Sequence, residues 1–170
     1  MSQPDDPAEN IFLADGHLRE DLFTEPALAA MREALQQTRD TRWDSVRSPH
    51  VFMGLLAVPD AGVRDWGERL EEDLIDILGQ FQELFRQEDG DNEPVLALNR
   101  EFLSDNVIRL LREAQQRAAG NGRTRITPMD LLICMLTTPN SIVAECFERI
   151  GITAAKLTEL AVIAEHHSGS

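Results

Sequence analysis

The sequence predicts an all-α fold made of two four-helix repeats that are related by a pseudo-twofold axis. Two apolar segments, residues 46–56 and 126–136, each follow a helix-starting signal, and both lie within an internal repeat. No segment has the alternating polarity of a strand of any length. Because a helix that is apolar on almost every face is normally enclosed by other helices, we expect each segment to form the central helix of its repeat.

The internal repeat aligns residues 24–77 with residues 104–157 without a gap. Identical pairs at this spacing include Arg32 and Arg112, Glu33 and Glu113, Leu56 and Leu136, Pro59 and Pro139, and Val63 and Val143. Apolar positions coincide as well, as at Met31 and Leu111. This shared pattern indicates a duplicated helical unit, although few residues are identical.

The first repeat is expected over residues 22–87. Its helices are predicted over residues 25–37, 49–58, 63–70 and 74–87. Thr24 and Ser48 open the first two helices, because a hydroxyl oxygen can accept a first-turn N–H group. The last helix is expected to be longer than its counterpart near the C terminus. Glu71 stands where the second repeat has Gly151, which suits a left-handed helix end, so we expect this join to be remodelled.

The second repeat is expected over residues 95–165. Its helices are predicted over residues 105–119, 128–136, 142–150 and 154–165. Ser104 caps the first of them. Thr127 caps the central helix, in which Pro128 needs no N–H donor at the first position and Asp130 lies near the positive end of the helix dipole.

Three segments are expected to lie outside the packed helical domain, which spans residues 22–165. Residues 1–21 are acidic with few apolar side chains, and we expect a mobile leader there. Residues 88–94 have no periodicity and predict a solvated connector between the repeats. The tail over residues 166–170 is expected to fray.

The order of elements in each repeat resembles the double Clp repeat, which forms the N-terminal domain of the Clp family of AAA+ protein unfoldases. Each copy has Thr24 or Ser104 before an amphipathic helix, and Val46 or Ile126 before the central apolar helix. A turn with Pro and a Val-containing helix follow. The resemblance covers residues 23–164 and implies a protein-binding domain that takes part in protein quality control.

In that family, substrate proteins or adaptors bind at the interface between the repeats and at the helix starts. The residues that the resemblance assigns to this site are Thr24, Ser48, Pro49, Met129 and Asp130. Each also has a structural interpretation, as a cap, a helix starter or a core residue. Some unfoldases of this type bind phosphorylated arginine through a Glu before the His of each repeat, but Pro49 and Met129 occupy those places here. Met129 instead offers an adaptable apolar contact for exposed client segments.

Composition excludes several other classes of function. The net charge of −14 disfavours binding to a phosphate backbone, so no nucleic-acid partner is expected. The sequence has no signal-peptide pattern and no apolar run near the ~20 residues that span a bilayer, so we expect a cytoplasmic protein without a membrane partner. Cys134 and Cys146 lie among apolar residues in helical segments, which favours core packing in a reducing compartment.

The sequence offers no catalytic residue, metal site or cofactor site. It lacks the glycine-rich nucleotide loop with its Lys, and it has no H-E-x-x-H or C-x-x-C motif. No His lies near either cysteine, so a nucleophile–base pair is missing. His50 is expected to make a local polar contact at a helix start. We therefore do not expect an enzyme.

The sequence leaves two hypotheses about function. In the first, the chain captures unfolded or tagged client proteins, or an adaptor protein, and passes them to an AAA+ motor that is either fused to it or a separate chain. In the alternative, it is a stand-alone regulatory or adaptor protein with the same fold, which senses a modified residue or a small ligand.

Overall fold

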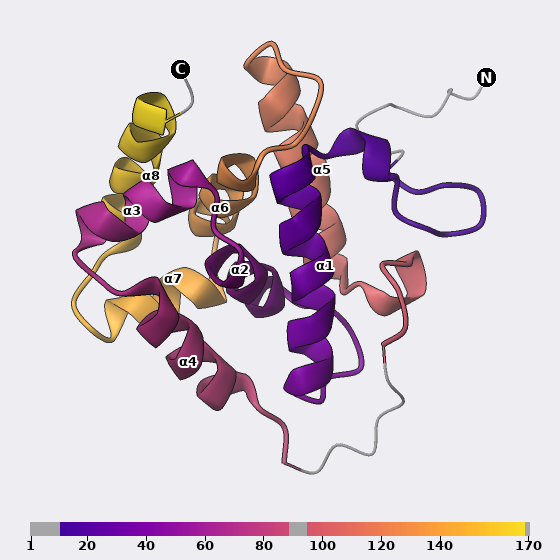
Figure 1. The fold of residues 1–170 in the computed structure, drawn as a ribbon, viewed down its shortest axis with the longest axis horizontal. Coiled ribbons are helices and arrows are strands. Elements are labelled where there is room, and N and C mark those ends of the chain that lie inside the picture. The colour runs from indigo at the N-terminus through magenta and orange to yellow at the C-terminus, as the bar shows by residue number, and fades with distance from the viewer. Residues whose placement is uncertain (1–10, 89–94, 169–170) are drawn as a thin grey trace.

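Helices make up the ordered elements of the chain, and no strand occurs over residues 11–88 and 95–168, which the computed structural model describes (Figure 1). The first repeat contains α1 (Glu25–Asp40), α2 (Ser48–Ala57), α3 (Ala61–Leu70) and α4 (Leu74–Phe85). The second contains α5 (Asp105–Gly120), α6 (Pro128–Thr137), α7 (Ile142–Glu148) and α8 (Ala154–Ser168). Short 3₁₀ helices, η1 (Glu20–Leu22) and η2 (Arg100–Phe102), precede the repeats. The all-α prediction with two four-helix repeats is confirmed.

The first two helices of each repeat match in length, whereas the third helices differ, with 10 residues in α3 and 7 in α7. Helices α1 and α5 have 16 residues each, and α2 and α6 have 10 each. The last helices differ, because α4 has 12 residues and α8 has 15. The expectation that the helix from Leu74 is the longer one is therefore wrong. The chain leaves α4 after Phe85 because Gln87 N–H donates to the Thr41 carbonyl, 2.9 Å away, which ties this end to the turn after α1.

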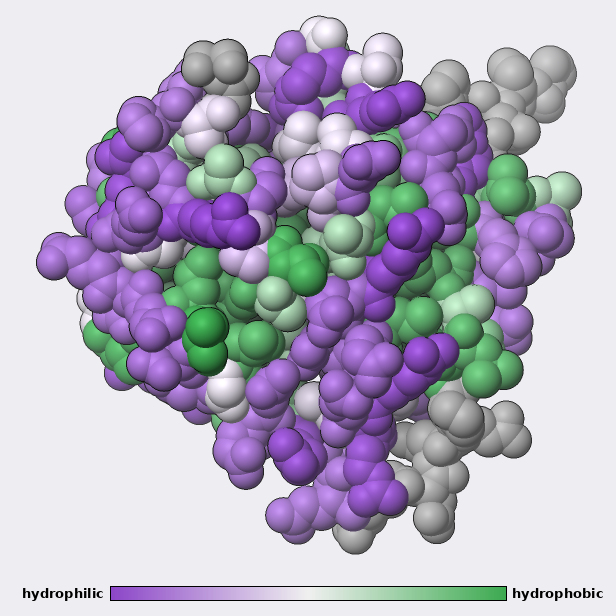
Figure 2. Space-filling model, in the orientation of Figure 1, coloured by the Kyte–Doolittle hydropathy of each residue, from purple (hydrophilic) through white to green (hydrophobic). Residues whose placement is uncertain are grey.

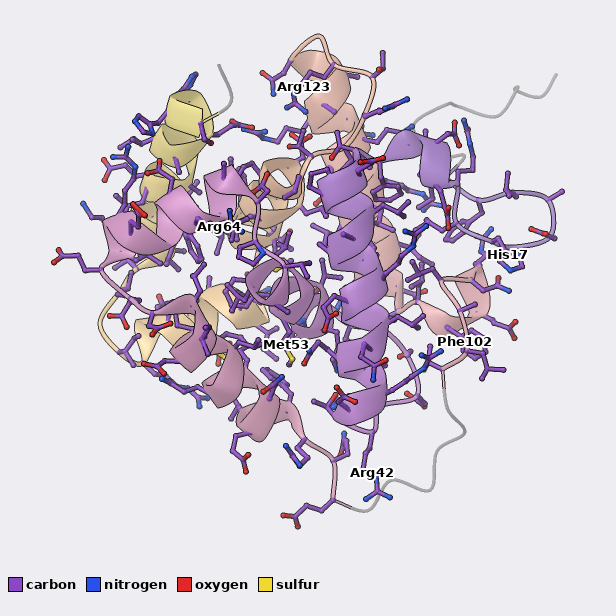
Figure 3. All side chains as sticks on the ribbon, viewed as in Figure 1. His17, Arg42, Met53, Arg64, Phe102 and Arg123 are labelled. Atoms are coloured by element: carbon purple, nitrogen blue, oxygen red, sulfur yellow. The ribbon has the colours of Figure 1, made fainter. Side chains whose placement is uncertain are left out.

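The central helices are buried, as the sequence predicts. Residues 49–56 of α2 and residues 128–136 of α6 are all buried, and Figure 1 shows both helices surrounded by the others. Figure 3 labels Met53 of α2 among these inner side chains. The ring of Phe147 on α7 meets those of Phe52, Trp66 and Phe81 in the first repeat at centroid distances of 5.9, 6.0 and 6.2 Å. One core therefore serves both repeats.

Backbone hydrogen bonds join the two repeats at equivalent places. Parallel bridges pair Phe23 with Ile126 and Val46 with Leu103. Their hydrogen bonds run from Ile126 N–H to the Leu22 carbonyl (2.7 Å), Thr24 N–H to Ile126 (3.0 Å), Val46 N–H to Phe102 (2.7 Å) and Ser104 N–H to Val46 (3.0 Å). In each repeat, the residue two positions before the central helix, Val46 or Ile126, therefore forms backbone hydrogen bonds with the other repeat.

Part of the expected leader is packed into the domain. Ile11 is fully buried, and Phe12 and Leu18 are nearly so. Leu18 N–H donates to the Leu98 carbonyl at 3.0 Å, which holds this segment beside the second repeat. The prediction of a mobile leader up to residue 21 therefore fails for residues 11–21, because their apolar side chains find partners far along the chain.

The ends of the other expected segments also differ. Residues 1–10 of the expected leader, residues 89–94 of the connector and residues 169–170 of the tail lie outside the described residues. Residues 166–168, which were expected to fray, continue α8. Within this last turn, the Ser168 hydroxyl donates to the Ala164 carbonyl at 2.7 Å.

The join after α3 is not remodelled. Glu71 has φ 60° and is the C-cap of α3, and Gly151 has φ 88° in the turn that follows α7, so a left-handed residue stands at the same place in both repeats. Glu71 N–H donates to the Glu68 carbonyl at 3.0 Å, and Glu72 N–H donates to Gly67 at 3.2 Å. These bonds offset the cost of about 1 kcal/mol that a side chain incurs in this conformation. The expectation based on Glu71 is therefore wrong.

The outer surface mixes polar and apolar areas. Figure 2 shows hydrophobic residues beside α2 and α4 on one face, and hydrophilic residues over α1. Ile75 and Leu84 are the exposed large hydrophobic residues of α4. No single helix of the described chain is long and apolar enough to cross a membrane, although α6 and α7 together, with a 72° bend, pass a test of length and composition. Almost all of α6 is buried in the core.

Replacement of Gly54 by Ala tests the close packing of α1 on α2. A methyl group at Gly54 would collide with the Ala30 carbonyl oxygen and lie 2.9 Å from Ala34 N. We expect a loss of about 2–3 kcal/mol in the free energy of unfolding, because backbone atoms cannot move aside as a side chain can. Gly79 of α4 is the matched control, since nothing lies within 4 Å of the added methyl. Gly79→Ala should stabilise by about 0.5–1 kcal/mol. Equal urea midpoints for the two variants would contradict this packing.

Candidate functional site

A groove of about 490 Å³ lies between the two repeats. The start of α2 forms one wall, α5 forms the opposite wall, and the turn between α6 and α7 closes one end. The groove-lining residues used below are Trp43, Arg47, Ser48, Pro49, His50, Arg109 and Ile142. We call this feature the inter-repeat groove. Its walls combine apolar and polar side chains, as is typical of binding sites.

His50 fixes the wall formed by α2. Its Nδ1 accepts the backbone N–H of Arg47, the N-cap residue, at 3.0 Å, which is the role that a Glu or Gln side chain has in a capping box. Its Nε2 lies 2.9 Å from Thr41 Oγ1, whose hydroxyl donates to the Gln37 carbonyl at 2.7 Å. Nδ1 accepts a hydrogen bond and therefore carries no proton, and the Thr41 hydroxyl proton is donated to Gln37. The proton of the neutral ring must therefore be on Nε2, which donates it to Thr41 Oγ1.

Burial lowers the pKa of His50 to about 4, and the charge of Arg47 acts in the same direction. The ring is therefore neutral near pH 7. Trp43 packs edge-on against it at a centroid distance of 5.8 Å, and the Arg47 guanidinium lies 4.7 Å from the centre of the Trp43 ring. The start of α2 is thus a rigid wall with a cation over an aromatic face.

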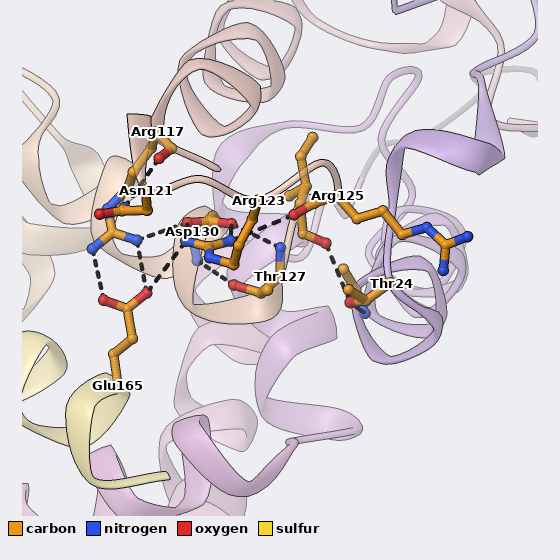
Figure 4. A network of polar contacts seen from close by, with 10 residues as sticks. Thr24, Arg117, Asn121, Arg123, Arg125, Thr127, Asp130 and Glu165 are labelled. Atoms are coloured by element: carbon orange, nitrogen blue, oxygen red, sulfur yellow. Dashed lines mark hydrogen bonds and ion pairs between the residues drawn. The ribbon is translucent and has the colours of Figure 1, made fainter. Parts of the chain in front are cut away.

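The second repeat has an ion network at the equivalent place. The network is formed by Arg117, Arg123, Asp130 and Glu165. In the first repeat, the equivalent residues are, in the same order, Gln37, Trp43, His50 and Phe85. Figure 4 shows Asp130 between the two arginines. Arg117 donates to Asp130 Oδ1 at 2.7 Å and to both oxygens of Glu165 at 2.7 and 2.8 Å. Arg123 donates to Asp130 Oδ1 at 2.8 Å and to Oδ2 at 2.5 Å. The network joins α5, α6 and α8.

Asp130 also completes the cap of α6. Its carboxylate accepts Thr127 N–H at 2.9 Å, and its own N–H donates to Thr127 Oγ1 at 3.1 Å. Burial by itself would raise the pKa of this carboxyl, but the hydrogen bonds from Arg123, Thr127 and Arg117 outweigh burial and lower the pKa. The hydrogen bonds to Glu165 and Asp130 raise the pKa of Arg117 against the effect of its burial. The network therefore stays charged at neutral pH.

The structure brings two of the five expected site residues to the groove. Ser48 and Pro49 line it as the first two residues of α2. Ser48 is not the cap that the sequence suggests, because Arg47 occupies that position. Thr24 does cap α1 and also donates to the Ile126 carbonyl at 3.2 Å, so its hydroxyl is used inside the protein.

Met129 and Asp130 were expected to make contacts at the surface, but both are buried. Asp130 is fully buried, and Met129 is 4% exposed. Met129 packs on Gly62 of α3, whose missing side chain leaves room for the thioether. The equivalent residues, Pro49 and Ile142, both line the inter-repeat groove. Pro49 and Ile142 thus border open space, whereas their counterparts, Met129 and Gly62, are in contact with each other. The side chain of Met129 therefore fills the place that is equivalent to part of the groove.

Sequence reasoning missed Trp43, Arg47, Arg109 and Ile142 as groove residues. Ile142 is the clearest case, since its side chain is 44% exposed at the start of α7. The repeat alignment contains a signal for it, because a large apolar residue stands opposite Gly62.

The side chains of the described chain offer little for nucleophilic or metal chemistry. No group of three or more His, Cys, Asp or Glu residues that could hold a metal ion occurs in the part of the chain that the structure describes. Burial raises the pKa of the Cys134 thiol to about 12 and also raises that of Cys146. Neither thiol is therefore an activated nucleophile at neutral pH.

Two solved structures share this arrangement of helices. The N-terminal domain of the caseinolytic-protease-associated chaperone ClpD from Arabidopsis thaliana has a TM-score of 0.66 and 18% identity, covering 87% of this chain and 97% of that one. The N-terminal domain of the ClpV1 ATPase from the E. coli EAEC Sci1 T6SS has a TM-score of 0.64 and 14% identity, covering 86% and 87%. The chain has the fold of a Clp N-terminal domain.

This Clp N-domain fold was not evident from sequence comparison. No protein-family profile matches the chain, and no curated protein matches it. The likeness therefore rests on the arrangement of the helices, and it confirms the fold that the duplicated pattern predicts.

Replacement of Asp130 by Asn tests the ion network. The amide keeps the shape but leaves two arginines short of a counter-ion, so we expect a loss of about 2–3 kcal/mol at pH 7. Because the folded pKa of Asp130 is lowered, its contribution is present above the unfolded pKa of about 3.9 and is lost as pH falls through the folded pKa. The difference between wild type and variant should therefore narrow below about pH 4.

Urea unfolding at pH 7, 5 and 3 measures this difference. Glu20→Gln is the control, since it breaks the exposed Arg32–Glu20 pair and should change stability little. A loss for Glu20→Gln as large as that for Asp130→Asn would contradict the role of the buried network.

Replacement of His50 by Gln tests the neutral ring at the start of α2. The folded pKa of about 4 lies below the unfolded value of about 6.5, so the wild type should lose about 2–3 kcal/mol of stability as pH falls from 6.5 to 4. Gln can still accept the Arg47 N–H but does not titrate, so His50→Gln should lack this loss. NMR titration of the His50 ring gives an independent check. A midpoint near 6.5 would refute the assignment of a buried neutral ring.

Proposed function

We propose that this chain is a protein-binding module that captures segments of unfolded or tagged client proteins, or an adaptor, for a Clp-type AAA+ unfoldase or protease system. The observation that carries the proposal is the inter-repeat groove on a Clp N-domain fold. The similar domains come from a protease-associated chaperone and from an ATPase. The motor that receives the client is either fused to this chain or a separate protein.

The groove supplies the contacts that a peptide segment needs. Pro49 and Ile142 provide apolar surface, and Ser48 provides a hydroxyl at the start of α2. Arg47 and Arg109 add positive charge to a protein whose net charge is −14, so a client with a carboxylate beside an apolar residue is favoured. We assign the direct contacts to Ser48 and Ile142, and Pro49, which is buried, supports this wall from beneath the surface.

Thr24, Met129 and Asp130 have a supporting role in this proposal. Thr24 holds the second repeat through Ile126, and Asp130 fixes the start of α6 through Thr127. Met129 fills the space next to Gly62. The contacts of Thr24 and Met129 join the two repeats and so help to set the width of the groove between them, whereas that of Asp130 lies within the second repeat.

The proposal describes a binding protein of the cytoplasm without catalytic activity. The raised pKa values of Cys134 and Cys146 favour packing over nucleophilic chemistry. Cys134 and Cys146 are both free, as expected for a reducing compartment.

Replacement of Ile142 by Asp tests the groove as the client site. We expect affinity for labelled, permanently unfolded casein to fall at least about tenfold, because a carboxylate would be desolvated against an apolar client segment. Ile150→Asp is the matched control, since Ile150 is 57% exposed and does not line the groove. Fluorescence anisotropy measures the affinity, and a thermal melt verifies that both variants stay folded.

The proposal fails if wild-type protein binds neither the unfolded chain nor a Clp adaptor protein. It also fails if Ile142→Asp and Ile150→Asp bind equally well. Binding of an adaptor instead of casein would be detected by repeating the comparison with a Clp adaptor protein.

A further inference from the structure

A second pocket, of about 460 Å³, opens at the start of α5. It is lined by Arg100, Leu103, Asp105, Ile108, Arg109 and Arg112. We call it the arginine pocket. Three guanidinium groups and one carboxylate give its walls a net charge of +2, in a protein whose net charge is −14. Arg109 also lines the inter-repeat groove, so the two sites adjoin.

Comparison of the two repeats shows how this concentration of positive charge arises. In the first repeat, Arg32 pairs with Glu20 of η1 at 3.3 Å. At the repeat spacing, Arg32 corresponds to Arg112 and Glu20 corresponds to Arg100 of η2. The second repeat therefore has an arginine where the first repeat has the neutralising carboxylate. Arg109 adds a further cation at a position where the first repeat has Ala29.

The three arginines have no anionic partner among the residues that the structure describes. No ion pair reaches Arg100, Arg109 or Arg112, and Arg112 Nε is buried without an acceptor. Arg100 lies over the Phe12 ring at 5.3 Å, a contact that favours one position of its guanidinium without neutralising it. A buried N–H without an acceptor is uncommon in a folded protein, and an external oxygen would satisfy it.

We propose that the arginine pocket binds a phosphoryl group. Guanidinium groups match the oxygens of phosphate in pairs of parallel hydrogen bonds, and a net charge of +2 matches the charge of about −2 on a phosphate monoester at pH 7. The ligand is either free inorganic phosphate or a phosphorylated side chain of a partner. Asp105 also lines the pocket, and its repulsion of anions is included in the net charge of +2. This site goes beyond client capture in the inter-repeat groove.

Titration with inorganic phosphate, followed by ³¹P NMR and by calorimetry, tests the pocket directly. We expect saturable binding to wild type that weakens at least about tenfold in Arg100→Glu, because the new carboxylate would pair with Arg112 as Glu20 pairs with Arg32. The same pairing should keep the thermal midpoint of the variant at or above that of wild type. Arg64→Glu is the control for net charge, since Arg64 is exposed on α3, on the other side of the view from Phe102 of η2 (Figure 3).

A second arm uses a phosphoserine peptide and its unphosphorylated form. Binding of the phosphopeptide alone identifies a partner's side chain as the source, and binding of phosphate identifies the free anion. If neither ligand binds saturably, or if Arg64→Glu weakens binding as much as Arg100→Glu, the proposal is overturned. The casein assay is separate, so client capture and phosphoryl binding fail independently.

Discussion

Four backbone hydrogen bonds between the repeats set the geometry on which the other contacts depend. Val46 and Ile126, the residues that precede the central helices, each pair with the segment that precedes the first helix of the other repeat. The starts of α2 and α6 are thereby fixed relative to α5 and α1. The inter-repeat groove lies where α2 begins and α5 faces it, so the exchange of backbone hydrogen bonds positions the candidate site.

One scaffold carries different chemistry at equivalent positions. In the first repeat, a neutral His50 fixes the start of the central helix, whereas in the second repeat the charged Asp130 does so. Each solution satisfies the same helix-start N–H groups. The neutral His50 lies beside the open groove. The charged Asp130 is linked to Glu165 of α8 through Arg117. The two repeats therefore differ at equivalent positions, with an open groove beside one helix start and a buried ion network at the other.

The sequence predicts the helices better than it predicts the site, for physical reasons. Caps such as Thr24 and Thr127 act within a few residues, so local sequence reveals them. Burial of Met129 depends on Gly62, and packing of residues 11–21 depends on Leu98, both distant in the sequence. Ser48 resembles a cap, yet it is the first residue of α2, and the N-cap is Arg47, whose N–H is accepted by the His50 ring. The groove itself is a property of both repeats together, so neither half of the sequence contains it.

The ring of Phe147 within the first repeat's aromatic cluster bears on how the chain folds. A half-chain alone would leave Phe52 and Trp66 without this neighbour and Val46 without its backbone partner. The bond from Thr24 to Ile126 closes a separation of 102 residues, so this contact forms only after distant parts of the chain have met. Such a topology slows folding relative to helical proteins that are built from local contacts. The two repeats therefore share one core and are not two domains joined in series.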